Sequence, residues 1–268
     1  MKRRTKIITA ATGAAVAGTI GLLSTASAQA STTVPLASSI KTTVAPGGNF
    51  KLSVWELQEP VGSPGSPTTI SSSRLQGSNG FQDSYFYTDK SDGAMTFWAP
   101  EKGVTTANSN FARSELREMN SSGSAANWSL GGTNKLNATL RVVSVTDHVT
   151  VGQIHLGTGG SSTKPLLELY YYANGDIKVG IENSPSGGQT PHTVGHVSVG
   201  KTWTYMIGES GAHTLNLTIN GTTTHYTIPS SFDPYKVYFK AGSYNQSSSN
   251  STTKGARVAF YALTVSHS

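Results

Sequence analysis

The sequence lacks cysteine altogether, and it has few charged residues. The absence of cysteine from all 268 residues excludes disulfide bonds, thiolate nucleophiles and cysteine-bound metals. Asp, Glu, Lys and Arg together make up only 13% of the chain. The chain also has no Gly-x-Ser-x-Gly elbow and no Gly-x-Gly-x-x-Gly turn. Serine-hydrolase and dinucleotide chemistry are therefore not predicted, and we expect no cofactor and no metal site.

The first thirty residues have the pattern of an export signal. Met1–Lys6 is basic, Ile7–Thr25 is uncharged, and Ala26–Ala30 offers small-x-small cleavage sites. A membrane anchor is the alternative, although the glycine and hydroxyl residues of the uncharged run make it a weak span. The Arg3-Arg4 pair leaves twin-arginine export open. We predict a secretory signal peptide over residues 1–30 and a secreted, extracellular protein with no membrane partner.

Most of the net positive charge belongs to this N-terminal segment. The whole chain has 20 basic and 14 acidic residues, which gives a formal net charge of +6. Four of the basic residues lie within residues 1–30, so the remainder has 16 against 14 and a net charge of +2. That balance argues against a nucleic-acid partner. Residues 31–268 are enough for a single domain with a substantial core.

Strand patterns dominate the rest of the chain. Leu136–Val142 and Thr214–Asn220 alternate between apolar and polar residues, and Val258–Val265 is an apolar run typical of a buried strand. Asn174-Gly175 and Asn220-Gly221 each separate two such runs and predict tight hairpins. The predicted fold is all-β: a jelly-roll sandwich of two antiparallel sheets with a concave substrate-binding face.

Three further segments qualify this outline. Phe50–Trp55 is strand-like, so the Gly- and Pro-rich Gly62–Pro67 that follows it is predicted to be a surface loop rather than a domain boundary. Ser247–Lys254 consists of small polar residues and one lysine, which predicts a second loop. Its position makes it a candidate wall or lid of a cleft, and a plain exposed loop is the alternative.

Three short polar segments share a strand parity: Arg113–Arg117, Gln153–His155 and Tyr238–Gln246. Side chains alternate between the two faces of a strand, so the polar groups of each segment fall on one face. That face would carry Arg113, Glu115, Arg117, Gln153, His155, Tyr238, Lys240, Tyr244 and Gln246. Leu116, Ile154, Phe239 and Ala241 would point the other way. The polar face is suited to an anionic, hydroxyl-rich ligand.

The same three segments resemble the signature regions of the alginate lyases of polysaccharide lyase family 7. Phe50–Leu57 and Asp92–Pro100 also lie where that family carries comparable stretches, so the similarity extends over essentially all of residues 50–268. The resemblance implies a β-jelly roll that cleaves alginate, an anionic polysaccharide, by β-elimination without a metal or cofactor. We also expect a monomer.

Elimination from a uronate polymer sets three tasks. The carboxylate beside C5 must be neutralised, a base must remove the C5 proton, and an acid must protonate the departing O4. By the family mechanism, Arg113 and Gln153 would hold the carboxylate, His155 would take the proton and Tyr244 would give one. For mannuronate, Tyr244 would act as both base and acid. These four are the predicted catalytic residues.

Four more residues are predicted to support substrate binding. Arg117, Lys240 and Gln246 would hold carboxylates and hydroxyls of neighbouring sugars, and Glu115 would orient the arginines rather than react. Each residue alone has an ordinary explanation, such as a solvated strand face with ion pairs or a structural histidine. Their joint occurrence favours an enzyme.

The middle residue of Gln153-Ile154-His155 bears on specificity. In the family, Ile at this position accompanies action on guluronate-containing blocks, so we expect that preference here. Because Ile154 should face away from the sugar, its influence would be indirect. Two alternatives stay open: a lyase for another uronate polymer such as glucuronan, and a non-catalytic carbohydrate-binding module, which would not need His155 and Tyr244 together.

Overall fold

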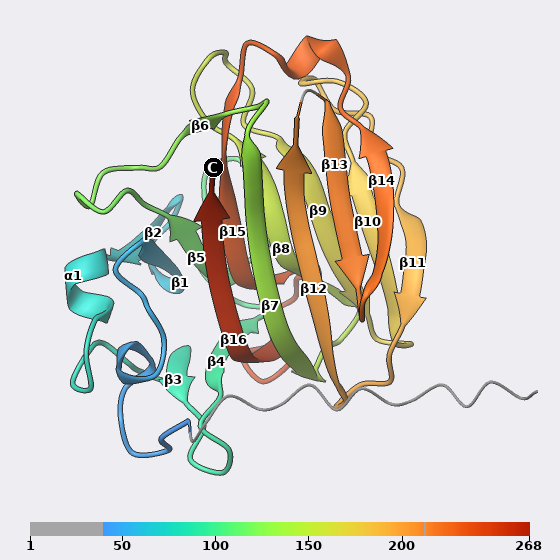
Figure 1. Cartoon of the computed structure of the whole chain (residues 1–268). Coiled ribbons are helices and arrows are strands. Elements are labelled where there is room, and N and C mark those ends of the chain that lie inside the picture. Colours follow the sequence, from blue (N-terminus) through green and yellow to red (C-terminus); the bar gives the residue numbers. More distant parts are fainter. Residues whose placement is uncertain (1–39, 212) are drawn as a thin grey trace, which may run out of the picture. The chain divides into compact units, whose positions relative to one another are not determined.

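The computed structural model describes residues 40–211 and 213–268, which belong to one compact unit (Figure 1). The predicted signal peptide lies outside the described residues and stays a prediction. Within the described part of the chain, no helix is both long and apolar enough to cross a membrane.

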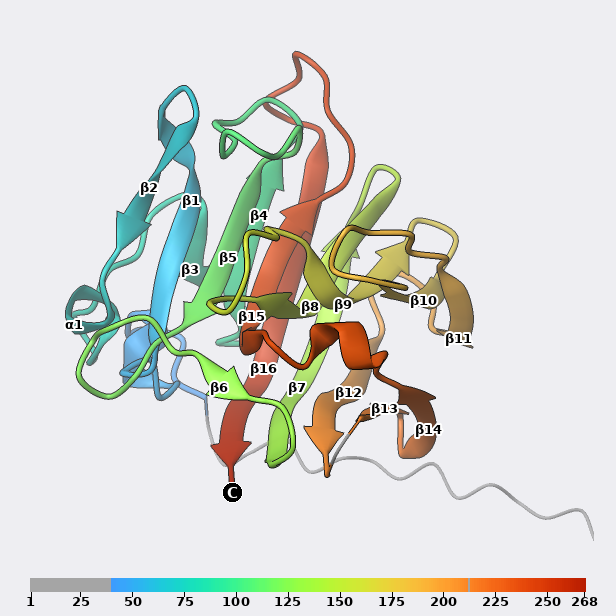
Figure 2. The same cartoon turned by 90° about the horizontal axis from the view of Figure 1, so that it is seen from above.

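Two antiparallel sheets stacked face to face form the described unit (Figures 1 and 2). The nine-stranded sheet has the order β11-β10-β9-β8-β15-β5-β1-β2, with β6 paired to β15. Its strands are β1 (Trp55–Ser63), β2 (Ser66–Ile70), β5 (Arg113–Glu118), β6 (Trp128–Ser129), β8 (His148–Leu156), β9 (Pro165–Tyr172), β10 (Asp176–Ile181), β11 (His192–His196) and β15 (Lys236–Asn245).

The seven-stranded sheet, in front in Figure 1, has the order β14-β13-β12-β7-β16-β4-β3. Its strands are β3 (Phe86–Thr88), β4 (Met95–Pro100), β7 (Thr133–Ser144), β12 (Thr202–Ser210), β13 (Thr214–Ile219), β14 (Thr222–Thr227) and β16 (Gly255–His267). Helical structure in the described residues is limited to α1 (Ser72–Leu75) and to 3₁₀ turns at Pro46–Gly48 and Ser230–Phe232. The prediction of an antiparallel two-sheet sandwich is confirmed.

Both predicted Asn-Gly hairpins are present. Asn220 and Gly221 join β13 to β14 with φ values of 48° and 86°, as expected for a hairpin turn that needs positive φ at both central positions. Gly175, at φ 90°, lies in the turn from β9 to β10, where the Asn174 side chain accepts a hydrogen bond from the Asp176 amide at 3.0 Å. Turn chemistry therefore sets these two registers locally.

The core lies between the sheets, and the predicted inward residues belong to it. Leu116, Ile154, Phe239 and Ala241 are all 0% exposed. They share one buried cluster with residues of the other sheet, including Phe260. Burial of this apolar face stabilises the sandwich and leaves the opposite face of the nine-stranded sheet to the polar side chains.

Two local predictions need correction. Phe50–Trp55 is not a strand, because β1 begins only at Trp55 and the residues before it form a turn. Gly62–Pro67 is exposed as predicted, but most of it is paired: it forms the tip of the β1–β2 hairpin, with Gly62 opposite Pro67. The chain reverses at Pro64-Gly65, between the paired Ser63 and Ser66, and Gly65 supplies the positive φ of 78° that the turn needs.

Candidate active site

The register of the nine-stranded sheet lines up residues from six strands in one row. Opposite one another, in order from β1 to β10, lie Glu56, Arg117, Lys240, Gln153, Glu168 and Gly180. The neighbouring pairs Tyr238–His155 and Tyr244–Arg113 flank this row. Segments more than a hundred residues apart in sequence are thus brought together on one face.

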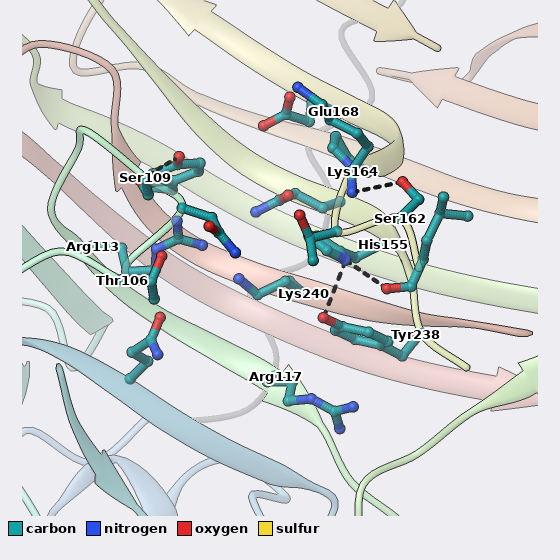
Figure 3. Close-up of a pocket in the computed structure, with 18 of the residues that line it drawn as sticks. Thr106, Ser109, Arg113, Arg117, His155, Ser162, Lys164, Glu168, Tyr238 and Lys240 are labelled. Carbon is teal, nitrogen blue, oxygen red and sulfur yellow. Dashed lines mark hydrogen bonds between the residues drawn. The ribbon is translucent and has the colours of Figure 1, made fainter. Parts of the chain in front are cut away.

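A cleft of about 550 Å³ lies over this row (Figure 3). All four predicted catalytic residues line it: Arg113, Gln153, His155 and Tyr244. Its walls also include Arg117, Tyr238 and Lys240.

Glu115 anchors the buried side of the cleft. Its side chain is 0% exposed, and its Oε2 accepts from Lys240 Nζ at 2.5 Å and from Arg113 Nη1 at 3.3 Å. Its Oε1 accepts from Gln153 Nε2 at 2.5 Å. Burial alone would raise the pKa of Glu115, but the charges of Lys240 and Arg113 outweigh it and lower that pKa. The ionised Glu115 therefore holds three potential substrate-binding groups in place.

Lys240 is itself 6% exposed, and burial lowers its pKa to about 8. It therefore remains mostly charged at neutral pH. The two positive charges of Lys240 and Arg113 exceed the single negative charge of Glu115. This leaves the cleft floor suited to an anion.

His155 is oriented by its backbone neighbour. Its Nδ1 lies 2.8 Å from the carbonyl oxygen of Leu156, so Nδ1 carries the hydrogen and Nε2 keeps its lone pair. The Tyr238 hydroxyl lies 3.1 Å from the same Nδ1, and the two rings are stacked with centroids 5.2 Å apart. Burial, together with the charge of Lys240, lowers the pKa of His155 to about 4. The imidazole is therefore neutral at physiological pH and can accept a proton.

Tyr244 lies beside Arg113 on the next strand. The Arg113 guanidinium stacks over the Tyr244 ring at 3.7 Å, and the Tyr244 hydroxyl is 2.9 Å from Ser109 Oγ. Close approach of β15 to β5 depends on Gly242, because a Cβ there would lie 2.7 Å from the Glu115 Cα. This tight pairing holds the Tyr244 ring against the Arg113 guanidinium.

The other predicted substrate-binding residues are less available. Arg117 lines the cleft, but its guanidinium stacks over Tyr238 at 4.0 Å and donates to the Glu118 carbonyl at 2.6 Å. Gln246 lies away from the cleft lining and donates to Thr150 Oγ1 at 3.0 Å. Their roles toward a substrate remain predictions, whereas the predicted contact of Glu115 with Arg113 is present.

One end of the cleft is acidic, which sequence reasoning missed. Glu168 and Glu182 line the cleft beside β9 and β10, with Lys164 next to them. Glu168 accepts from the Tyr170 hydroxyl at 2.7 Å and from Gln189 Nε2 at 3.3 Å. Burial raises the pKa of both glutamates. A usable signal was the alternation of Glu168 with Tyr170 in an otherwise apolar run.

The loop walls also differ from expectation. None of the predicted wall, Ser247–Lys254, is among the lining residues, and its Ser247 donates to Glu101 at 3.0 Å. The wall near Tyr244 is formed instead by the segment before β5, through Thr106, Asn108 and Ser109.

Two short motif matches escaped the sequence reasoning, and the fold explains both. Gly195–Thr202 fits the spacing of a phosphate-binding loop, but it runs from β11 to β12 and no helix follows it. His192 and His196 have the spacing of a helical zinc pair but lie on strand β11, roughly 13 Å apart at about 3.3 Å per residue. Within residues 40–211 and 213–268, no group of three or more His, Asp or Glu could hold a metal ion.

Comparisons with known proteins find alginate lyases. A family model described as alginate lyase matches residues 50–267. An alginate lyase from Klebsiella pneumoniae is 27% identical over 282 aligned residues, which cover 83% of this chain and 91% of that protein.

Solved structures of alginate lyases are also similar. One from Pseudomonas aeruginosa is 34% identical, with a TM-score of 0.75 over 81% of this chain and 99% of its own. A variant of the family 7 alginate lyase A1-II′ in complex with a product written GGG is 35% identical, with a TM-score of 0.75 over 84% of this chain and 100% of its own. The predicted jelly-roll fold is therefore confirmed. The chain belongs to the alginate lyases of polysaccharide lyase family 7.

Proposed function

We propose that this alginate lyase is secreted and cleaves guluronate-containing chains by β-elimination in the cleft over β5, β15 and β8. The observation that carries the proposal is the meeting of four groups in one cleft: Arg113, Gln153, His155 and Tyr244. They supply the neutralising donors, the base and the acid that the elimination requires.

Arg113 and Gln153 act on the substrate carboxylate. Both are fixed by the buried Glu115, and each keeps further N–H groups for a ligand. Their donors stabilise the charge that develops when the C5 proton leaves. Because Glu115 is buried and ionised, the donors are pre-organised before the substrate arrives.

The proton transfers fall to His155 and Tyr244. His155 presents a neutral imidazole with its Nε2 lone pair free of the carbonyl bond, which suits removal of the C5 proton of guluronate. Tyr244 then protonates O4 as the C4–O4 bond breaks and the C4=C5 double bond forms. The Arg113 cation over the Tyr244 ring stabilises the phenolate left behind.

The guluronate preference rests on the resemblance of Gln153-Ile154-His155 to the family segment that carries Ile. Ile154 is fully buried beneath Gln153 and His155, so it acts on specificity only by positioning them. Solved complexes of A1-II′ variants hold a product written GGG and a substrate written GGMG. Secretion rests on the basic, apolar and small-residue pattern of residues 1–30.

The proposal is tested by incubating residues 31–268 with polyguluronate, polymannuronate and glucuronan. Ultraviolet absorbance of the new double bond reports elimination. We expect the fastest rise on polyguluronate; a faster rise on polymannuronate would overturn the guluronate preference. Secretion is tested by expressing the full chain in its host and sequencing the N-terminus of the extracellular protein, and retention in the cell would contradict it.

A further inference from the structure

The proposed proton donor has a partner that does not belong to a strand. Among the described residues, the Tyr244 hydroxyl has one hydrogen-bond partner, Ser109 Oγ at 2.9 Å. Ser109 lies in the loop that precedes β5, and it lines the cleft. Figure 3 shows Ser109 toward the same end of the cleft as Arg113 and away from His155. The serine hydroxyl is therefore placed beside the acid of the proposed elimination and not beside the base.

The loop holds this hydroxyl in place. Ser109 Oγ accepts a hydrogen bond from the Phe111 amide at 3.1 Å, and it lies 3.1 Å from the Phe111 carbonyl oxygen, to which it can donate. The Ser109 amide donates to the Thr106 carbonyl at 3.0 Å, and Thr106 forms a β-bridge with the tip of the β1–β2 hairpin. Near β5, the Asn245 amide donates to the Ala112 carbonyl at 3.2 Å. The loop that carries Ser109 is thus tied to the sheet on both sides of the serine.

The hydrogens around Ser109 allow two arrangements. A serine hydroxyl has one hydrogen and two acceptor lone pairs, and the Phe111 amide occupies one of the lone pairs. If Ser109 donates to the Phe111 carbonyl, it accepts the hydrogen of Tyr244, which is then not offered to a substrate. If Ser109 donates to Tyr244 instead, the phenol keeps its own hydrogen free for a ligand. Rotation of one O–H group therefore decides where Tyr244 directs its proton.

Proton transfer requires the second arrangement. Once Tyr244 has given its proton to O4, the phenolate oxygen can only accept hydrogen bonds, so Ser109 must be the donor. A hydrogen bond to an ionised oxygen is about twice as strong as one between neutral groups. The contact is therefore stronger when negative charge develops on Tyr244 than in the resting enzyme. An interaction of this kind raises kcat and leaves KM unchanged.

We propose that Ser109 is a positioning residue for the elimination: its hydroxyl donates to the Tyr244 oxygen, directs the phenol proton to O4 and stabilises the phenolate that remains. Ser109 acts through Tyr244 and needs no contact with the substrate. This inference rests on the proposed function, since it requires Tyr244 to be the acid. It adds a loop residue to a mechanism whose other groups all lie on strands of the nine-stranded sheet.

Loss of the serine hydroxyl should affect turnover and not substrate binding. Ser109→Ala removes the donor to Tyr244, so kcat on polyguluronate should fall by about tenfold to a hundredfold, as for one hydrogen bond to a charged group, with KM unchanged. Ser109→Thr keeps a hydroxyl on the same carbon and should recover most of the native kcat. The control is Asn110→Ala. Asn110 is the exposed neighbour in the same loop, outside the cleft lining, and its variant should keep the native kcat and KM.

A double variant separates action through Tyr244 from any other role of Ser109. Tyr244→Phe lacks the phenol oxygen, so adding Ser109→Ala to it should lower the residual turnover no further. Ultraviolet absorbance of the new double bond measures kcat and KM on polyguluronate for the native enzyme, the four single variants and this double variant. Thermal midpoints verify that each protein is folded.

Three outcomes would overturn the role of Ser109. If Ser109→Ala kept the native kcat, with or without a higher KM, the serine would be no more than part of the cleft wall. If Ser109→Thr were as slow as Ser109→Ala, the hydroxyl would not be the cause. If Ser109→Ala lowered turnover by the same factor in the Tyr244→Phe enzyme, it would act by another route.

The same assay tests the proposed function separately. Absence of elimination by the native enzyme, or near-native turnover in Tyr244→Phe, would contradict the proposed mechanism itself. A native enzyme that needs Tyr244 but gives one of the three outcomes above would refute only the role of Ser109.

Discussion

The two halves of the cleft shift the pKa values of their carboxyl groups in opposite directions. Glu115, on β5, forms ion pairs with Lys240 and Arg113, and their charges lower its pKa although its side chain is completely buried. Glu168, on β9, accepts hydrogen bonds from the uncharged side chains of Tyr170, Thr150 and Gln189, and burial raises its pKa. Burial alone therefore does not decide the charge of a side chain; the charge of its partners does. The partners of Glu115 lower its pKa, whereas the pKa values of Glu168 and Glu182 are raised.

The largest effect is expected where the basic half meets the reacting sugar. Tyr244→Phe removes the proposed proton donor while keeping the ring under Arg113, so kcat should fall by about 10²–10⁴-fold. Circular dichroism and the thermal midpoint should be unchanged. Ultraviolet turnover assays on polyguluronate measure the loss. Near-native turnover with a native fold would remove Tyr244 from the mechanism.

Glu115→Ala tests the ionised half directly. It leaves Lys240 and Arg113 buried without their counter-charge, and the free energy of unfolding should fall by about 3–5 kcal/mol. Urea denaturation measures this change. Glu115→Gln keeps the shape and one acceptor, so its loss should be smaller. Equal and negligible losses in both variants would show that the ion pairs do not hold the cleft floor together.

His155, on β8, lies between the two halves of the cleft. Its environment predicts that kcat/KM stays high to an unusually low pH. Its pKa is lowered to about 4 by burial and by Lys240, so the imidazole stays neutral down to that pH. The plot of kcat/KM against pH should therefore fall only as pH decreases through about 4, not through the ordinary histidine value of about 6.5. A limb near 6.5 in the free enzyme would contradict the proposed environment of the base.

The smallest change in the free energy of unfolding is expected at the β9–β10 end of the cleft, where Glu168 and Glu182 lie. Glu168→Gln keeps the shape of the side chain and removes a carboxyl whose pKa is raised, so at neutral pH the free energy of unfolding should fall by less than it does in Glu115→Ala. Because the folded-state pKa of Glu168 is raised, ionisation at higher pH destabilises the native enzyme, and the variant should become relatively more stable there. Thermal melts from pH 5 to pH 9 measure the difference. A stability loss comparable to that of Glu115→Ala would erase the contrast between the halves.

Sequence parity predicted much of this cleft because it depends on strands of regular pleat. It placed Arg113, Gln153, His155 and Tyr244 on one face, and Ile154 in the core. Sequence parity could not predict the hydrogen bond from Thr150 to Glu168. Thr150 is three residues before Gln153, so strict alternation would place the two side chains on opposite faces of the sheet. An extra residue in β8, between Thr150 and Gly152, shifts the register against β9 and reverses the parity.

Other features were beyond such reasoning for different reasons. Ser109 approaches Tyr244 from a loop, where no periodicity exists to indicate direction. The stacking of Arg117 on Tyr238 depends on cross-strand register, which one segment does not contain. Glu168 followed the alternating pattern, but it was masked by the apolar residues around it.

The place of β15 in the sheet has a consequence for when the enzyme becomes active. β15 begins at Lys236 and lies between β8 and β5, so it joins the strands that carry Gln153 and Arg113. Until it inserts, those strands have no common neighbour, Tyr244 is absent from the cleft and Glu115 lacks Lys240. Such long-range pairing is late and slow in folding. A nascent chain without β15 is therefore inactive, and the appearance of lyase activity reports the insertion of this strand.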